Sequence, residues 1–140
     1  MKTLIVEDDP TSRLLLQEYL KMYGTLHIAV NGEEAVEAVR VALEADKPYN
    51  LICLDIMMPE MDGQEALKEI RALEEAKGIW STHGAKVVMN TALGDMKNAC
   101  AAFNGLCDAY LVKPIDKTKL LETLRELSLI NSPQGSTRDT

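Results

Sequence analysis

Short apolar runs alternate with longer amphipathic segments along the chain, and this pattern predicts both kinds of secondary structure. The runs are rich in Val, Ile and Leu, as in strands that are covered on both faces. They predict strands at residues 3–6, 26–30, 51–54, 85–89 and 108–112. After each run, apolar residues recur at the three- and four-residue spacing of a helix. Five strands alternating with five helices predict a doubly wound α/β fold with one parallel sheet.

Each predicted helix begins at an Asp or Asn side chain that can cap its first turn: Asp9, Asn31, Asp62, Asp95 and Asp116. Pro10 follows the first of these caps and is favoured at the first helical position. We expect the first helix to turn Leu14, Leu15 and Leu20 toward the core. The fourth helix is expected to end near Phe103, before an Asn-Gly pair.

Two segments do not fit the alternation. The polar connection at 74–84, which contains Trp80, is longer than most loops between a helix and a strand. Either the preceding helix extends into it, or Trp80 folds back over the core. The tail at 131–140 is polar and contains Pro and Gly, so we expect it to be disordered. One domain is therefore predicted at residues 1–130.

The amino-acid composition limits the classes of function that the chain can have. The 140 residues are 46% hydrophobic and 26% charged, which is ordinary for one soluble globular domain. A net charge of −7 disfavours direct binding to nucleic acid, which requires a basic face. The chain has no apolar run long enough to span a membrane and no signal-peptide pattern, so we expect a cytoplasmic protein. Cys53, Cys100 and Cys107 are expected to be free thiols.

Polar residues stand where four of the predicted strands end. Glu7 and Asp8 follow the first strand, Asp55 the third, Thr91 the fourth and Lys113 the fifth. In a doubly wound sheet these ends form the edge where ligands bind. Three clustered carboxylates repel one another unless a cation joins them, and their oxygens suit Mg²⁺ or Mn²⁺. Lys113 and Thr91 would complete a site for a phosphoryl group, although any one of these residues alone would fit a salt-bridged rim.

Four motifs, IVEDD, LDIMMPEMDG, NTA and YLVKP, occur in this order at the predicted strand ends. Together they resemble the receiver domain of bacterial two-component response regulators, over roughly residues 1–129. The resemblance implies a flavodoxin-like sheet with strand order 2-1-3-4-5. It implies that Asp55 accepts a phosphoryl group from a histidine kinase or phosphotransfer protein. Asp8 and Asp55 would bind Mg²⁺ directly, Glu7 would bind it through water, and the Met57 carbonyl would add a ligand.

The same resemblance assigns roles to a second set of residues. Thr91 and Ala92 match the pair that senses the phosphoryl group, and Tyr110 matches an aromatic residue that moves between exposed and buried positions. Lys113 matches the phosphate-contacting lysine before a cis proline. The domain would catalyse only its own phosphorylation and dephosphorylation. The face formed by the fourth helix, fifth strand and fifth helix would bind a downstream protein, or a second copy in a homodimer.

Two other classes share parts of this pattern. A phosphatase with a strand-end Asp nucleophile needs a second acid two residues later, where this chain has Met57. A flavin-binding module needs a loop rich in Ser, Thr or Gly after the first strand, where this chain has the acidic residues 7–9. Both remain as alternatives to the receiver and are less favoured.

By the same resemblance, two apolar side chains flank the path that water would take toward a phosphorylated Asp55. These are Met57 and Leu93. Apolar side chains exclude water and offer it no hydrogen-bonding partner. We therefore expect a comparatively persistent phosphoryl state.

Overall fold

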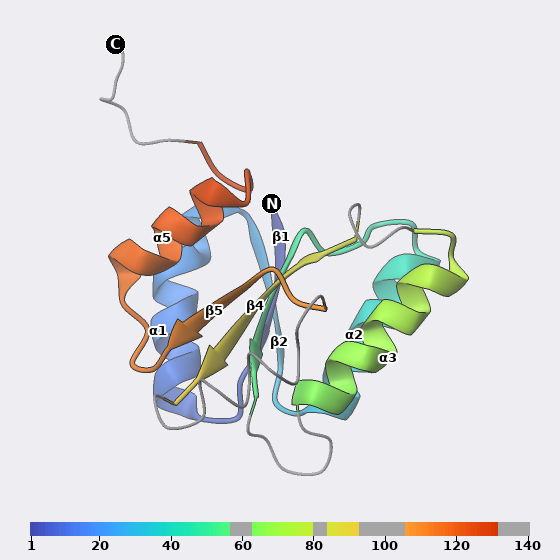
Figure 1. Ribbon diagram of the computed structural model, residues 1–140, viewed down its shortest axis with the longest axis horizontal. Helices are drawn as coiled ribbons and strands as arrows, with labels where there is room; N and C mark the ends of the chain where they lie inside the picture. The colour runs from blue at the N-terminus through green and yellow to red at the C-terminus, as the bar shows by residue number, and fades with distance from the viewer. Residues whose placement is uncertain (57–62, 80–83, 93–105, 132–140) are drawn as a thin grey trace.

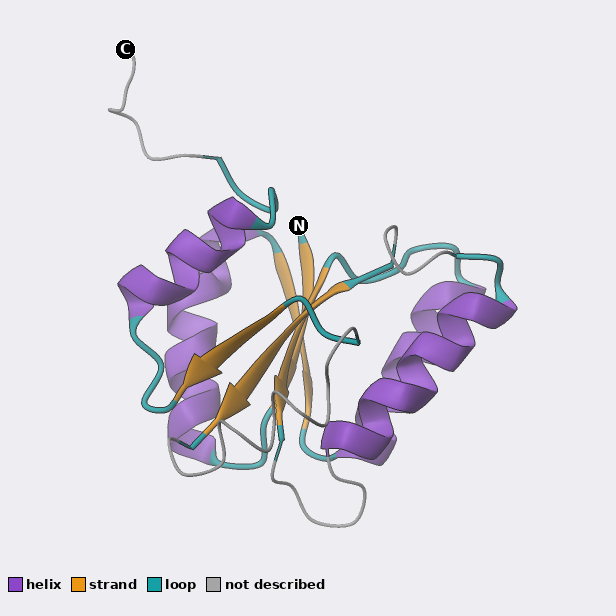
Figure 2. Ribbon diagram, viewed as in Figure 1, coloured by secondary structure: helices purple, strands orange, loops and turns teal. Residues whose placement is uncertain are grey.

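The computed structural model describes residues 1–56, 63–79, 84–92 and 106–131. Within these ranges, five parallel strands form one sheet in the order β2-β1-β3-β4-β5. The strands are β1 (Lys2–Val6), β2 (Thr25–Ala29), β3 (Leu51–Asp55), β4 (Lys86–Thr91) and β5 (Ala109–Val112). Figure 2 shows them as a single twisted layer with helices on both sides. The predicted fold class and strand order are confirmed.

Helices cover both faces of the sheet: α1 (Pro10–Leu20), α2 (Gly32–Glu44), α3 (Gly63–Ala76) and α5 (Lys117–Glu126). A short 3₁₀ turn, η1 (Lys21–Tyr23), follows α1. Figure 1 shows α1 and α5 together on one face, and α2 and α3 together on the other. Among the described residues, every helix is too short or too polar to cross a membrane. The helix predicted at 95–103 lies outside the described residues.

Each face of the sheet has its own apolar core. The α1/α5 core consists of Ile5, Leu16, Leu20, Leu51, Cys53, Val88, Leu111, Ile115, Leu120 and Leu124. The α2/α3 core is built around Leu4, Val6, Leu54, Leu67, Ile70 and Met89. Successive residues of a strand point to opposite faces, so Ile5 packs in one core and Leu4 in the other. Burial on both faces explains why the strands appear in the sequence as continuous apolar runs.

Three predicted N-caps are confirmed by side-chain hydrogen bonds. The side-chain oxygens of Asp9, Asn31 and Asp116 each accept from the backbone N–H three residues later, at 2.9, 2.8 and 3.0 Å respectively. These bonds satisfy donors that have no partner within the first helical turn. The caps predicted at Asp62 and Asp95 lie outside the described residues.

The buried face of α1 differs from the predicted one. Leu16 and Leu20 are fully buried, whereas Leu14 is 64% exposed and Leu15 is 38% exposed. Residues four apart share one side of a helix, so burial of Leu20 selects Leu16 as its neighbour. The prediction was right for Leu20 and wrong for Leu14 and Leu15.

The end of α3 decides one of the two alternatives for the polar connection at 74–84, namely whether the helix extends into it. Helix α3 continues to Ala76, so it extends into the connection predicted at 74–84. Strand β4 is also longer than predicted, because it includes Asn90 and Thr91 at its end. Trp80 lies outside the described residues.

The C-terminal boundary stays a prediction. Helix α5 ends at Glu126, and the structure describes the chain only as far as residue 131. The tail predicted to be disordered at 131–140 therefore lies almost entirely outside the described residues.

Charged side chains join α3 to the segments that lead into β4 and β5. The Arg71 guanidinium donates to the Glu74 carboxylate at 2.7 Å and to the Asp108 carboxylate at 3.3 Å. It also donates to two backbone carbonyls, both at 2.9 Å. The two carboxylates in turn accept backbone N–H groups at 2.7 and 2.8 Å. The Glu74 side chain is only 5% exposed, so these contacts hold its carboxylate in a buried position.

Candidate functional site

Three carboxylates meet where β1 and β3 end. Glu7 and Asp8 follow β1, and Asp55 is the last residue of β3. One carboxylate oxygen from each residue lies within 4.8 Å of the other two. Glu7 and Asp55 are buried, whereas Asp8 is exposed. The acids predicted from the strand ends therefore come together, with Asp8 on the solvent side.

Lys113, the residue after β5, reaches the same cluster. Its ammonium nitrogen lies 3.0 Å from Glu7 Oε1 and 3.3 Å from Asp55 Oδ2. Burial by itself would lower the pKa of Lys113, but the hydrogen bond to Glu7 and the charges of Asp55 and Glu7 raise it overall. The Lys113–Pro114 peptide bond is cis, as the resemblance implied.

The environment of Asp55 disfavours its charged form. Burial raises the pKa of Asp55 to about 7, and the hydrogen bond and negative charge of Glu7 act in the same direction. Lys113 opposes these effects without cancelling them. Two buried acids share one ammonium group, so an additional cation would stabilise the ionised site.

The donor set fits a magnesium ion. The ligand atoms that the described residues bring together are carboxylate oxygens, the hard ligands that Mg²⁺ prefers. Glu7 Oε1 is buried and makes no well-directed hydrogen bond within the described part of the chain, although Lys113 lies 3.0 Å away. An oxygen of this kind is available to a cation or to its bound water. Met57, the fourth predicted ligand, lies outside the described residues.

Sequence comparison identifies the family to which these features belong. The response regulator receiver domain family matches residues 3–125. The chain belongs to this family. The transcriptional regulatory protein SrrA of Staphylococcus aureus is 33% identical over 135 residues, which are 96% of this chain and 49% of SrrA. ZraR of Salmonella typhimurium, also a transcriptional regulatory protein, is 33% identical over 88% of this chain and 25% of its own length.

The receiver thus spans half or less of the length of these two relatives. Solved receiver structures share its fold. The receiver domain of the sensor histidine kinase PA1611 from Pseudomonas aeruginosa superposes with a TM-score of 0.70 and 26% identity. The match covers 91% of this chain and 97% of that one, whose active-site cleft holds a magnesium ion. The family assignment favours the receiver over the phosphatase and the flavin-binding module.

The predicted phosphoryl-sensing pair lies at the end of β4, and the predicted mobile aromatic residue lies within β5. Thr91 is buried at the end of β4, and its hydroxyl donates to the Ala92 carbonyl at 3.2 Å. Ala92 itself is exposed. Tyr110 lies in β5 and packs, partly buried, against the α2/α3 core. The structure places these side chains in the receiver, and their switching roles stay predictions.

Two further residues contact or adjoin Asp55 and were not predicted as site residues. Gly63, the first residue of α3, donates its backbone N–H to the Ile56 carbonyl at 2.9 Å. A Cβ at position 63 would lie 2.6 Å from the Asp55 carbonyl oxygen, so only glycine fits there. Asn90 is fully buried and pairs with Asp55 in the sheet. In the sequence, the only indication of a role for Asn90 was a polar residue directly after a predicted buried strand.

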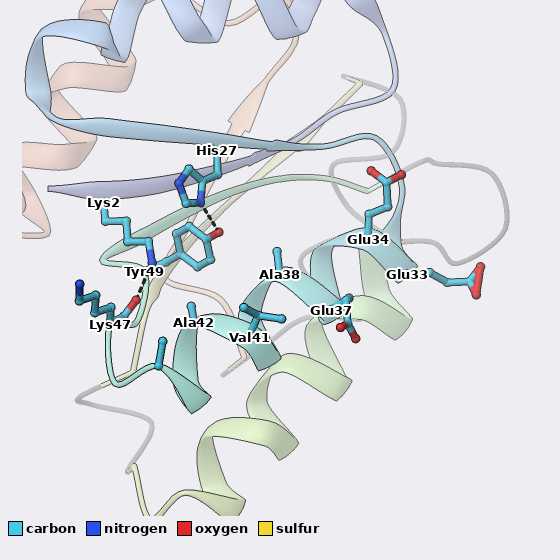
Figure 3. A pocket seen from close by; sticks show the side chains of 11 residues that line it. Lys2, His27, Glu33, Glu34, Glu37, Ala38, Val41, Ala42, Lys47 and Tyr49 are labelled. Atoms are coloured by element: carbon cyan, nitrogen blue, oxygen red, sulfur yellow. Dashed lines mark hydrogen bonds between the residues drawn. The ribbon is translucent and has the colours of Figure 1, made fainter.

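A groove separate from the acid cluster lies along α2, and Figure 3 shows the side chains that line it. Its volume is about 560 Å³, and Val41 and Ala42 of α2 contribute to its wall. Opposite them, His27 Nδ1 lies 2.6 Å from the Tyr49 hydroxyl, and the Lys2 ammonium lies 4.6 Å from the centre of the Tyr49 ring. Those predicted site residues that the structure describes do not line this groove.

Proposed function

We propose that this receiver accepts a phosphoryl group on Asp55. The main support is the arrangement around that residue. Asp55 ends β3 as a buried carboxylate, Lys113 lies 3.3 Å from one of its oxygens, and two more acids lie within 4.8 Å. An ionisable nucleophile next to a fixed cation and a magnesium-type donor set matches the needs of phosphoryl transfer.

In this proposal Asp55 is the nucleophile. One of its oxygens bonds to phosphorus while the bond from phosphorus to the donor breaks, and that electron pair leaves with the donor. Lys113 exchanges its contact with Asp55 for a phosphoryl oxygen and offsets the charge there. When held by Glu7, Asp8, Asp55 and the Met57 carbonyl, Mg²⁺ would supply a second positive charge for the same oxygens. Mn²⁺ would suit the same oxygen ligands.

Phosphorylation would then change the conformation around β5. The Thr91 hydroxyl, which now donates to the Ala92 carbonyl, would turn toward the phosphoryl oxygens. Its movement would leave space for Tyr110 and shift a pre-existing two-state equilibrium. A face that includes β5 and α5 would bind the downstream protein in the shifted state.

The proposed partners follow from this chemistry. A sensor histidine kinase or a phosphotransfer protein would donate the phosphoryl group in the cytoplasm. The receiving partner would be a protein, or a second copy of this chain in a homodimer. The net charge of −7 disfavours direct contact of the receiver itself with nucleic acid.

Acetyl phosphate provides a direct test, because it replaces the kinase as donor. With excess Mg²⁺, intact-mass spectrometry should show one added phosphoryl group on the wild-type protein and none on Asp55→Asn. Asp46→Asn is a matched control, since Asp46 is exposed and has a positive φ that asparagine tolerates. Phosphorylation of the Asp55→Asn variant at the wild-type level would place the acceptor elsewhere.

A second test concerns how long the phosphoryl group persists. The double substitution Met57→Asn with Leu93→Glu should speed its loss by about one to two powers of ten, since polar groups can orient the attacking water. Release of inorganic phosphate after removal of the donor measures this rate. Unchanged or slower decay in the double variant would contradict the idea and indicate that loop motion controls water access.

A further inference from the structure

Asn90 carries a buried polar side chain that has no partner among the described residues. It is fully buried in β4, and neither Oδ1 nor Nδ2 makes a hydrogen bond within the described ranges. An unpaired buried amide costs stability, whereas an apolar side chain of similar size would fit a core strand without that cost. We therefore expect the Asn90 amide to gain a hydrogen-bonding partner in another state of the protein.

The register of the sheet places Asn90 beside the phosphoacceptor. Asp55 of β3 pairs with Asn90 of β4. Paired residues of neighbouring strands point to the same face, and the strands lie about 4.8 Å apart. Cys53 and Val88, two residues earlier in the same strands, both belong to the α1/α5 core. Asp55 and Asn90 therefore turn to that face as immediate neighbours.

The side chain of Lys113 passes over the position of Asn90. It follows β5, yet its ammonium contacts Asp55 of β3 and Glu7 beyond β1, at 3.3 and 3.0 Å. Strand β4 lies between β5 and β3. The side chain of Lys113 must therefore span the end of β4, where Asn90 is the last residue on the α1/α5 face. The register thus places Asn90 next to Asp55, and the strand order places it under the path of the lysine side chain.

We propose that Asn90 is a positioning residue of the phosphoryl site, which holds the Asp55 carboxylate when Lys113 leaves it for the incoming phosphoryl group. This inference rests on the proposed function, because phosphoryl transfer to Asp55 is what draws Lys113 away. The Nδ2 group of Asn90 then donates to the Asp55 oxygen that does not attack. The Oδ1 atom can accept from the Lys113 ammonium, which has three hydrogens to donate.

The substitution Asn90→Leu separates this role from simple packing. The variant should resist urea better than the wild type, because it no longer buries an unpaired amide. Its initial rate of phosphorylation by acetyl phosphate in excess Mg²⁺ should nevertheless fall about tenfold. Asn90→Val tests the same points with a smaller side chain. Asn90→Thr has the same shape as valine but keeps a hydroxyl donor, so it should retain more of the rate than Asn90→Val.

Thr3 offers a matched control. Its hydroxyl is also fully buried and lacks a partner among the described residues, but it lies at the opposite end of β1 from the acids. Thr3→Val should stabilise the protein without changing the phosphorylation rate. A similar loss of rate in this control would indicate a general packing effect and overturn the proposal.

Different results would overturn the role of Asn90 and the phosphorylation of Asp55. Wild-type rates in Asn90→Leu and Asn90→Val, or equal rates in Asn90→Val and Asn90→Thr, would overturn the role of Asn90 and leave phosphorylation of Asp55 intact. A wild-type protein that takes no phosphoryl group would instead overturn the proposed function, before any Asn90 variant is compared.

Discussion

Replacing Arg71 with methionine is expected to lower the free energy of unfolding by about 3–5 kcal/mol. Methionine keeps most of the length of the side chain but leaves the Glu74 carboxylate, 5% exposed, as a buried charge without its cation. Two backbone carbonyls lose their donor as well. Urea denaturation followed by circular dichroism measures the change.

Arg40 provides the comparison for this experiment. It also bridges two carboxylates, those of Glu37 and Glu44, but its side chain is 41% exposed against 12% for Arg71. Exposed pairs gain little because water solvates the separated charges well. Arg40→Met should therefore change stability far less than Arg71→Met. Equal effects of the two substitutions would show that the Arg71 network is not stabilised by its burial.

Mg²⁺ at about 100 times its dissociation constant is expected to add roughly 2.7 kcal/mol to the free energy of unfolding, because it binds only the folded acid cluster. The effect should depend on pH. The folded-state pKa of Asp55 is about 7, above its ordinary value of 3.8. Its contribution to metal-free stability is full below about pH 4 and is lost as pH rises through about 7. A fixed concentration of Mg²⁺ should therefore stabilise the protein more at about pH 8 than at about pH 5.

Asp8→Asn is the matched variant for the metal experiment. Removing one of three clustered acids relieves their repulsion, so the metal-free variant should melt above the wild type. It should also lose the response to Mg²⁺ and the ability to be phosphorylated. Thermal melts in chelator and in excess Mg²⁺ give both comparisons. A metal-free variant that melts below the wild type, or a full response to Mg²⁺, would contradict the proposed magnesium site.

The sequence predicted the fold well because its strongest signals are local. An unbroken apolar run such as 51–54 suits a strand buried on both faces, and a cap such as Asn31 marks where a helix begins. Parallel strands also bring their carboxyl ends to one edge, so strand-end residues could be grouped without knowledge of distances. For these reasons the cluster of Glu7, Asp8 and Asp55 was found correctly.

The features that sequence analysis missed depend on contacts between distant segments. Leu14 and Leu16 have the same chemistry, and only packing against the sheet decides which one is buried. Arg71 and Asp108 are 37 residues apart, so nothing in the local pattern reveals that they pair. Asn90 could be recognised as a neighbour of Asp55 only once the register of β3 and β4 was known.

Gly63 has a consequence for how related sequences are interpreted. The space beside it is filled by backbone atoms of Asp55 and Ile56, which would meet any side chain whatever residue occupies position 55. A descendant of this chain that had lost its phosphoacceptor would therefore still be under selection to retain the glycine. Retention of glycine at this position indicates inheritance of the fold, whereas inheritance of signalling has to be judged from the carboxylates.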